Sequence, residues 1–204
     1  QRVMKEHKWI IFNGDGYSEA WTQEAAKRGL LNLATTVDAL PRYLDQKNIE
    51  LFTSHKIYTE AEMEARYETI LEEYQKTLNI EALTMSEMTR QDILPSVSGY
   101  IASLAEAVAA KRAVIADLPC QAETALIRKL SGLLDSAYEK VEKLDALVSD
   151  GKAESHNTLS AATYYKDVII PAMAELRAVV DQMEVDTSAD FWPYPSYGDL
   201  MFRV

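Results

Sequence analysis

The chain has 204 residues, a formal net charge of −11, 48% hydrophobic residues and a single cysteine, Cys120. This hydrophobic content indicates a folded domain and not a disordered tail, and one cysteine excludes an internal disulfide. A surface this acidic repels nucleic acid and anionic lipid, so neither is expected as a partner. No purely apolar run approaches the roughly 18 residues that span a bilayer, and cysteine usage indicates a reducing compartment. We therefore expect a cytoplasmic protein with no membrane partner.

The N-terminal region is predicted to contain a short strand, a turn and two helices. Trp9–Phe12 is an apolar segment that fits the strand. Ser18 offers an N-cap to the first helix, and Gly29 stands where a helix C-terminus needs a left-handed residue. A second helix is expected from Val37 to about Asp45, with Pro41 limiting its length or lying in its first turn. Because position 1 is not methionine, the simplest interpretation is a fragment of a longer chain.

The stretch FNGDGYSEAW, residues 12–21, raises the question of a phosphate or metal loop. A phosphate cradle of the G-x-G-x-x-G type needs glycine where Glu19 stands, and the carboxylate of Asp15 would repel a phosphate. A calcium loop that starts at Asn13 needs glycine at its sixth position, which is Ser18. We interpret the stretch as a turn followed by a capped helix, with direct ligand binding as the alternative.

The middle of the chain is predicted to form long amphipathic helices. Thr59 and Glu62 make a capping-box pattern that opens the first of them. Apolar residues then recur at helical spacing up to Pro95, where we expect a kink or break near Asp92, and the pattern resumes beyond it. A turn is expected at 117–119.

Two further long helices follow. The first carries an apolar stripe from Leu126 to Val148 and is expected to end at Gly151. A polar loop, KAESHNTLS, leads to the second, from about Leu159 to Met183, with another kink expected at Pro171. Three long stripes joined by short polar loops predict an all-α fold, an antiparallel bundle of partly kinked helices. An extended coiled coil between chains is the alternative, and the irregular spacing argues against it.

Two stretches are candidates for contact with another surface. DFWPYPSYGDLMFRV, residues 190–204, holds five aromatics and two prolines, so we expect an extended tail that packs on its own bundle or on a neighbouring part of the parent chain. NIEALTMSEMTRQDILP, residues 79–95, mixes Thr84, Ser86 and Thr89 into a methionine-rich stripe, which indicates either irregular packing or a domain contact. The candidate contact residues are Phe191, Trp192, Tyr194, Tyr197, Phe202, Met85 and Met88.

The residues that could carry chemistry do not form a recognisable centre. The histidines, His7, His55 and His156, lie far apart, and none has a Glu or His partner at helical spacing as a di-iron bundle requires. Cys120, beside Pro119 at a helix start, is either a thiol of lowered pKa or a small buried residue. We predict no catalytic, cofactor-binding or metal-binding residue in this chain.

Three stretches together resemble the C-terminal region of type III glutamine synthetases. They are HKWIIFNGDGYSEAWTQEAAKRGLLNLATTVDALP, NIEALTMSEMTRQDILP and FWPYPSYGDLMFRV, and the resemblance covers residues 7–204. It implies a parent enzyme that joins ammonia to glutamate at the expense of ATP, uses Mg²⁺ or Mn²⁺, and assembles as stacked hexameric rings. The family's ATP, glutamate and metal motifs lie upstream of this region, so no catalytic residue is carried over.

The resemblance also implies a domain organisation. Residues 1–46 would be the trailing segment of the catalytic domain, 47–189 the helical C-terminal domain, and 190–204 an aromatic tail that packs back on the protein. The chain would then be structural, in oligomerisation, or regulatory, and not catalytic alone. Its partners would be the upstream catalytic domain and neighbouring subunits. The alternative is a free-standing helical adaptor for a protein or peptide, and an unrecognised enzyme is a weaker third possibility.

Overall fold

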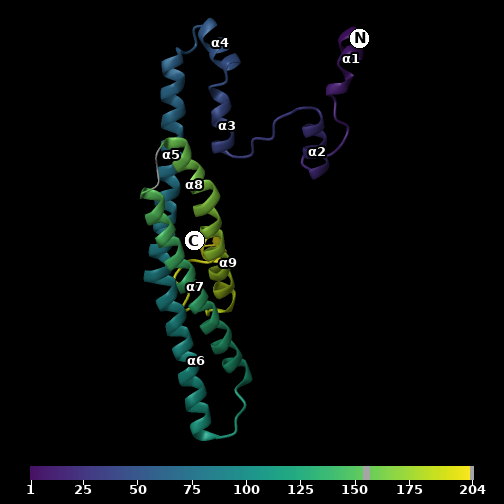
Figure 1. Ribbon diagram of the computed structural model, residues 1–204. Coiled ribbons are helices and arrows are strands. Elements are labelled where there is room, and N and C mark those ends of the chain that lie inside the picture. The colour runs from purple at the N-terminus through teal and green to yellow at the C-terminus, as the bar shows by residue number, and fades with distance from the viewer. Residues whose placement is uncertain (154–156, 203–204) are drawn as a thin grey trace. The chain divides into compact units, whose positions relative to one another are not determined.

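The structure is a computed structural model that describes residues 1–153 and 157–202, and these residues form helices and connecting turns without a strand. The predicted all-α fold is confirmed (Figure 1). The chain divides into two compact units, Gln1–Glu60 and Ala61–Val204. Each unit is described by itself. The domain boundary that we predicted between residues 46 and 47 stays a prediction.

The first unit consists of short helices. They are α1 (Arg2–Glu6), the 3₁₀ turn η1 (Lys8–Ile10), α2 (Glu19–Lys27), α3 (Thr36–Tyr43) and α4 (Gln46–Ser54). The predicted strand at Trp9–Phe12 is wrong. A strand needs a neighbouring strand to pair its backbone groups, whereas here the N–H of Ile10 donates to His7 O and that of Ile11 to Lys8 O, both at 3.1 Å. The helix α4 was not predicted.

Helix α2 begins and ends where its sequence signals stand. The Ser18 hydroxyl accepts a hydrogen bond from the N–H of Trp21, and Gly29 has a φ of 73°. Past the last turn, the N–H of Leu30 donates to Ala25 O at 2.9 Å and that of Gly29 to Ala26 O at 3.0 Å. These two bonds make the Schellman motif that closes many helices at glycine. The predicted cap and stop are confirmed.

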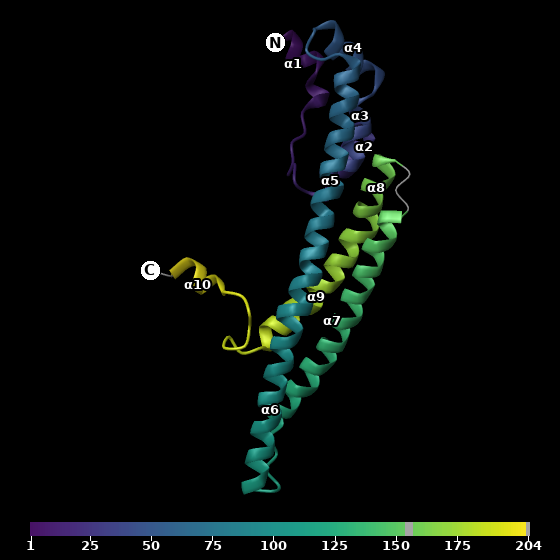
Figure 2. The same cartoon turned by 90° about the vertical axis from the view of Figure 1, so that its left-hand side faces the viewer.

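The second unit is an antiparallel bundle of long helices (Figures 1 and 2). Its elements are α5 (Glu60–Met88), η2 (Thr89–Ile93), α6 (Leu94–Val114), α7 (Gln121–Ala153), α8 (Thr158–Tyr164), η3 (Tyr165–Ile169), α9 (Ile170–Asp186) and α10 (Tyr197–Phe202). Helix α7 packs on α6 along one side and on α9 along the other. One continuous apolar core joins them, and its fully buried members include Val97, Leu130, Val141, Leu144, Ile169, Leu176 and Met183.

Two prolines that fall inside long helices each follow a π-helical turn. Pro95 comes two residues after η2 and Pro171 two residues after η3. In both turns the residue before the proline donates its N–H five residues back, Leu94 to Thr89 O and Ile170 to Tyr165 O. Proline lacks an N–H and its ring clashes with the carbonyl four residues earlier, so a wider turn accommodates it. Of the kink or break expected near Asp92, the break is absent, because α5 continues through η2 into α6. The helix is irregular at the expected place, in the π turn that contains Asp92.

The sequence predicted that the second long helix ends at Gly151, and this prediction is wrong. Helix α7 continues to Ala153, and a Cβ built on Gly151 would lie 2.5 Å from Cε1 of Tyr164. The Tyr164 hydroxyl donates to Leu147 O at 2.9 Å, which holds the ring in place. Glycine is needed here for a close helix–helix approach. Part of the predicted polar loop, with His156, lies outside the described residues, and α8 begins after Asn157, which caps it.

The last residues of the described tail are helical where an extended form was predicted. The N–H of Ser196 donates to Asp199 Oδ2 at 2.9 Å, and the N–H of Asp199 donates to Ser196 Oγ at 3.2 Å. This reciprocal pair is a capping box. It starts α10 beyond the two prolines, so neither proline lies inside the helix. Residues 188–196 form turns and irregular backbone.

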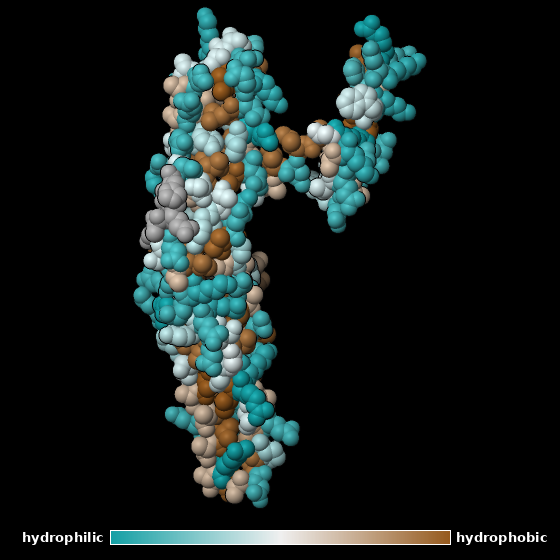
Figure 3. Space-filling model, in the orientation of Figure 1, coloured by the Kyte–Doolittle hydropathy of each residue, from teal (hydrophilic) through white to brown (hydrophobic). Residues whose placement is uncertain are grey.

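The helical run Glu60–Val114 is 55 residues long and contains an 18-residue window that is apolar enough to cross a membrane by length and composition alone. Only 11% of that window is buried. Apolar side chains also gather over the α6–α7 part of the bundle in the space-filling view (Figure 3). A single helix that qualifies by length and composition is weak evidence for a membrane span.

Candidate functional site

An apolar groove of about 480 Å³ lies on the second unit, between the α5–η2 helix and α9. Its floor contains Ile93 and Leu176, which belong to the buried core. The remaining lining residues form its walls and rim, and they are Ile80, Glu81, Thr84, Met85, Met88, Thr89, Met173, Arg177 and Val180. Methionine walls adapt to the shape of what they contact, because the side chain is unbranched and polarizable. The groove is therefore suited to an apolar segment.

The polar residues in the methionine-rich stretch have a structural place. Thr89 is 1% exposed, and its hydroxyl donates to Met85 O at 2.8 Å, which satisfies it within its own helix. Threonine can be buried in a helix in this way without leaving an unpaired hydroxyl. Thr89 therefore lines the groove without leaving a buried hydroxyl unsatisfied.

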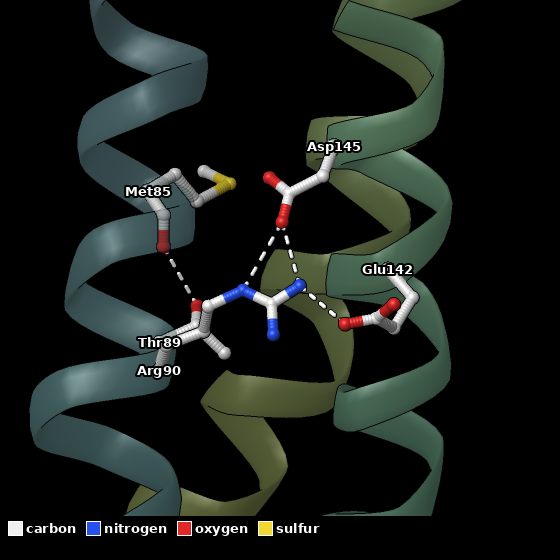
Figure 4. Close-up of polar contacts among 5 residues, drawn as sticks. All are labelled: Met85, Thr89, Arg90, Glu142 and Asp145. Carbon is white, nitrogen blue, oxygen red and sulfur yellow. Dashed lines mark hydrogen bonds and ion pairs between the residues drawn. The ribbon is translucent and has the colours of Figure 1, made fainter. Parts of the chain in front are cut away.

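Arg90 clamps the π turn η2 to α7 (Figure 4). Its Nε and Nη2 lie 3.0 and 2.6 Å from Asp145 Oδ2, and Nη2 lies 2.5 Å from Glu142 Oε1. Hydrogen bonds to Glu142 and then to Asp145 raise the pKa of Arg90 above its ordinary value. The guanidinium fork can hold two carboxylates at once, which a lysine cannot do with the same geometry. The clamp fixes the turn that lines the groove.

The aromatic tail attaches to the same π turn. The Tyr194 hydroxyl donates to Asp92 Oδ2 at 2.8 Å. Burial first, and then the Asp92 carboxylate, raise the pKa of Tyr194 to about 12. Trp192 packs edge-on against Tyr194 with ring centroids 6.4 Å apart, and Phe191 lies 5.3 Å from the ring of Tyr100. The start of the tail is thus fixed beside the groove.

The structure places the seven candidate contact residues in three settings. Phe191, Trp192 and Tyr194 are partly buried against the bundle, and Met85 and Met88 line the groove. Tyr197 and Phe202 lie on α10 and are 85% and 78% exposed. The contact role itself stays a prediction.

Sequence reasoning missed the second wall of the groove, which Met173, Arg177 and Val180 form on α9. The spacing of Met173 and Val180 identified them as part of an apolar stripe. That spacing predicts which face of α9 points inward, and it does not reveal that α5 stands far enough from α9 to leave the face open.

Among the described residues, those first considered for chemistry have other roles or share no site. In residues 12–21, Asp15 Oδ1 accepts from the N–H of Tyr17 at 2.9 Å and Ser18 Oγ donates to Asp15 O at 2.7 Å, which confirms the turn-and-cap interpretation. Cys120 is buried, with a φ of 45°. Over residues 1–153 and 157–202, no group of three or more His, Cys, Asp or Glu side chains is placed to hold a metal ion.

The comparisons with known proteins agree on one family. The family model for the glutamine synthetase C-terminal domain matches residues 1–112. A glutamine synthetase from Butyrivibrio fibrisolvens is 36% identical over an alignment that covers 100% of this chain and 30% of the relative. A type-3 glutamine synthetase from Dictyostelium discoideum is 32% identical, with 97% of this chain and 27% of the relative covered.

A glutamine synthetase from Bacteroides fragilis is 29% identical over 98% of this chain and 28% of the relative. The chain thus spans less than a third of the length of these relatives. The family match includes the whole first unit together with α5, η2 and most of α6. The chain belongs to the glutamine synthetase family and corresponds to its C-terminal domain.

Proposed function

We propose that this chain is the non-catalytic C-terminal domain of a type III glutamine synthetase. The intact enzyme would make glutamine from glutamate and ammonia with ATP and Mg²⁺ or Mn²⁺, in the cytoplasm. The observation that carries the proposal is the alignment of nearly the whole chain with under a third of each relative, one of them a type-3 enzyme. ATP and metal would be held by the upstream catalytic domain.

Within that enzyme the domain would make contacts that hold the catalytic part and neighbouring subunits in stacked hexameric rings. The first unit supports this role, because it exposes large apolar side chains: Trp9 is 66% and Ile10 61% exposed. Exposed apolar patches of this kind mark surfaces that another protein surface covers. Residues 1–46 would meet the catalytic domain as its trailing segment. The groove methionines and the aromatic tail would supply further contacts.

The experiment removes residues 190–204 from the full-length gene product. We expect smaller assemblies by light scattering and a loss of ATP-dependent glutamine formation, because Tyr194 and Trp192 no longer cover the bundle. Val185→Ser, at an exposed position on α9, is the matched control and should leave both unchanged. Intact rings with normal rates after the deletion would rule out a contact role for the tail.

The adaptor alternative makes a different prediction about the gene. A glutamine synthetase gene encodes the catalytic domain upstream of Gln1, whereas an adaptor gene does not. Sequencing the region upstream decides between them.

A further inference from the structure

The backbone of the long helix Glu60–Val114 is weakened at η2. Pro95 has no N–H, so the carbonyl four residues earlier, at Gln91, receives no amide hydrogen bond from it. Prolines and π turns are the places at which long helices bend. Within this run of 55 residues, η2 is therefore the turn at which the helix is expected to bend or open.

Two ties hold η2 from opposite sides. Residues two positions apart in a helix point in nearly opposite directions, and here they are Arg90 and Asp92. Arg90 is paired with Glu142 and Asp145 on α7, whereas Asp92 accepts the hydrogen bond from Tyr194 in the tail. In Figure 2 the tail accordingly lies on the side of the α5–α6 helix that faces away from α7. Movement of the turn toward either side would stretch the tie on the other.

The tail forms a short and stiff strap, which we define as residues 188–194. It starts two residues after α9 ends at Asp186. Thr187 lies between them, and it is buried with its hydroxyl donating to Met183 O at 2.7 Å, which fixes the first end of the strap. At the other end, Tyr194 stands between Pro193 and Pro195. Prolines restrict their own backbone and that of the residue before them. Tyr194 therefore loses little conformational entropy when it bonds to Asp92.

Aromatic packing fixes the middle of the strap on the other side of Pro95. The ring of Phe191 lies 5.3 Å from the ring of Tyr100, and a Cβ built on Gly99 would lie 3.8 Å from the Phe191 ring, at ordinary contact distance. Trp192 packs against the buried core of the bundle. The strap thus joins the end of α9 to the long helix both before and after the proline.

We infer that the strap locks η2 and thereby sets the shape of the groove between the α5–η2 helix and α9. The turn contributes Thr89 and Ile93 to the groove lining. While Tyr194 is bonded to Asp92, this end of the groove is fixed. When that bond is lost, η2 keeps its tie to α7 and loses the one on the opposite side, so the turn opens and the lining moves with it. This lock is a property of the chain itself and is independent of ring assembly.

The test is amide exchange, followed by NMR, in the 204-residue chain with Tyr194→Phe. This change removes one hydroxyl and keeps the ring. Exchange of the amides of residues 89–94 should become at least about fivefold faster, which corresponds to about 1 kcal/mol for one hydrogen bond. Tyr197→Phe is the matched control, because it removes the same group from an 85% exposed position on α10, and it should leave exchange unchanged.

The second π turn, η3, separates a local effect from a general loss of stability. It has the same geometry, but the hydroxyl of its Tyr165 donates to Asn79 Oδ1 at 3.0 Å and the turn is buried in the core. Its amides should exchange at the same rate in Tyr194→Phe as in the parent chain. An equal acceleration in η2 and η3 would overturn the lock, and so would unchanged exchange in residues 89–94.

Variants of Asp92 test whether the bond to Tyr194 is responsible. Asp92→Ala removes the acceptor, so adding Tyr194→Phe to it should cause little further change, as expected for two changes that remove one interaction. Asp92→Asn keeps a side-chain oxygen that can accept from the tyrosine hydroxyl, and it should retain most of the protection. Independent, additive effects of the two changes would contradict the assignment.

The groove is observed through the methyl groups of Met88 and Ile93, which line it. In Tyr194→Phe we expect their NMR signals to shift or broaden. The methyl signal of Met63, which is buried near the start of α5, should stay the same. Unchanged Met88 and Ile93 signals, together with faster exchange in residues 89–94, would show that the strap does not set the groove and would overturn the inference.

Discussion

The two units of this chain use similar residues in different ways. In Ala61–Val204, long helices bury a continuous core of aliphatic side chains. In Gln1–Glu60, the buried apolar residues are Ala25 and Val37, while Trp9, Ile10 and Leu31 are exposed. Helices of nine residues or fewer each present too little apolar surface to build such a core. Apolar composition therefore yields a core only where helices are long enough to pair along their length.

The first unit is organised instead by local contacts around one cation. Arg28 donates from Nε to Glu24 at 2.7 Å and from Nη1 to Trp9 O at 2.9 Å. It also lies 5.9 Å from the ring centroids of Phe12 and Trp21, which pack on each other at 4.6 Å. The hydrogen bond from Arg28 lowers the pKa of Glu24. Such contacts order the loop and α2 without a large buried area.

The largest difference between the units should appear when one side chain is truncated in each. Leu176→Ala removes a fully buried leucine from the core of the second unit. We expect the free energy of unfolding to fall by about 2–5 kcal/mol, from lost burial and the cavity left behind. Leu51→Ala, at an exposed position of α4, should cost about 0.5 kcal/mol or less. Guanidinium unfolding followed by circular dichroism measures both, and equal losses would contradict the comparison.

Two glycines in α7 sharpen the comparison within the second unit. Gly151→Ala places a Cβ 2.5 Å from the Tyr164 ring, whereas a Cβ at Gly132 meets nothing within 4 Å. We expect Gly151→Ala to destabilise by about 1–3 kcal/mol through overpacking. Gly132→Ala should stabilise by about 0.5–1 kcal/mol, because alanine favours a helix interior. Thermal unfolding of the two variants is the measurement, and a stabilised Gly151→Ala would refute the close approach.

Arg28→Gln tests whether the first unit depends on its cation. Its loss frees Trp9 O and Glu24 and uncovers two aromatic rings, so amide exchange in residues 9–28 should become about fivefold faster. Exchange in α7 should not change. Lys27→Gln removes the same charge from an exposed neighbour and should leave residues 9–28 as protected as before. A faster exchange in both variants would mean that net charge, and not the Arg28 contacts, is responsible.

A further effect is confined to alkaline pH and concerns the attachment of the tail. The pKa of Tyr194 is about 12 in the folded chain, whereas a tyrosine in the unfolded chain has a pKa of about 10. The unfolded state therefore loses this proton first, so the stabilising contribution is complete below pH 10 and is lost as the pH rises toward 12. Tyr194→Phe should remove this part of the decline. Unfolding free energies of both chains between pH 9 and 12 measure it, and parallel curves would contradict the assignment.

Much of the fold could be predicted because its signals are local. Ser18 and Gly29 begin and end α2 through hydrogen bonds that reach no more than five residues along the chain. The stripes of α7 and α9 predicted which faces are buried, because helical spacing alone defines a face. For the candidate site, the sequence identified Met85, Met88 and the aromatic residues of the tail. It did not identify how these groups are arranged around η2.

The sequence by itself determined the helical class, the start and end of α2 and the apolar face of the long helices. Only the tertiary structure decided that Gly151 admits the ring of Tyr164, and that α5 stands off from α9 to leave a groove. It also decided that Asp92 accepts a hydrogen bond from Tyr194, which lies 102 positions further along the chain. The physical reason is range: capping and helical spacing act within a turn or two, whereas a close approach or an open groove depends on where a distant helix lies.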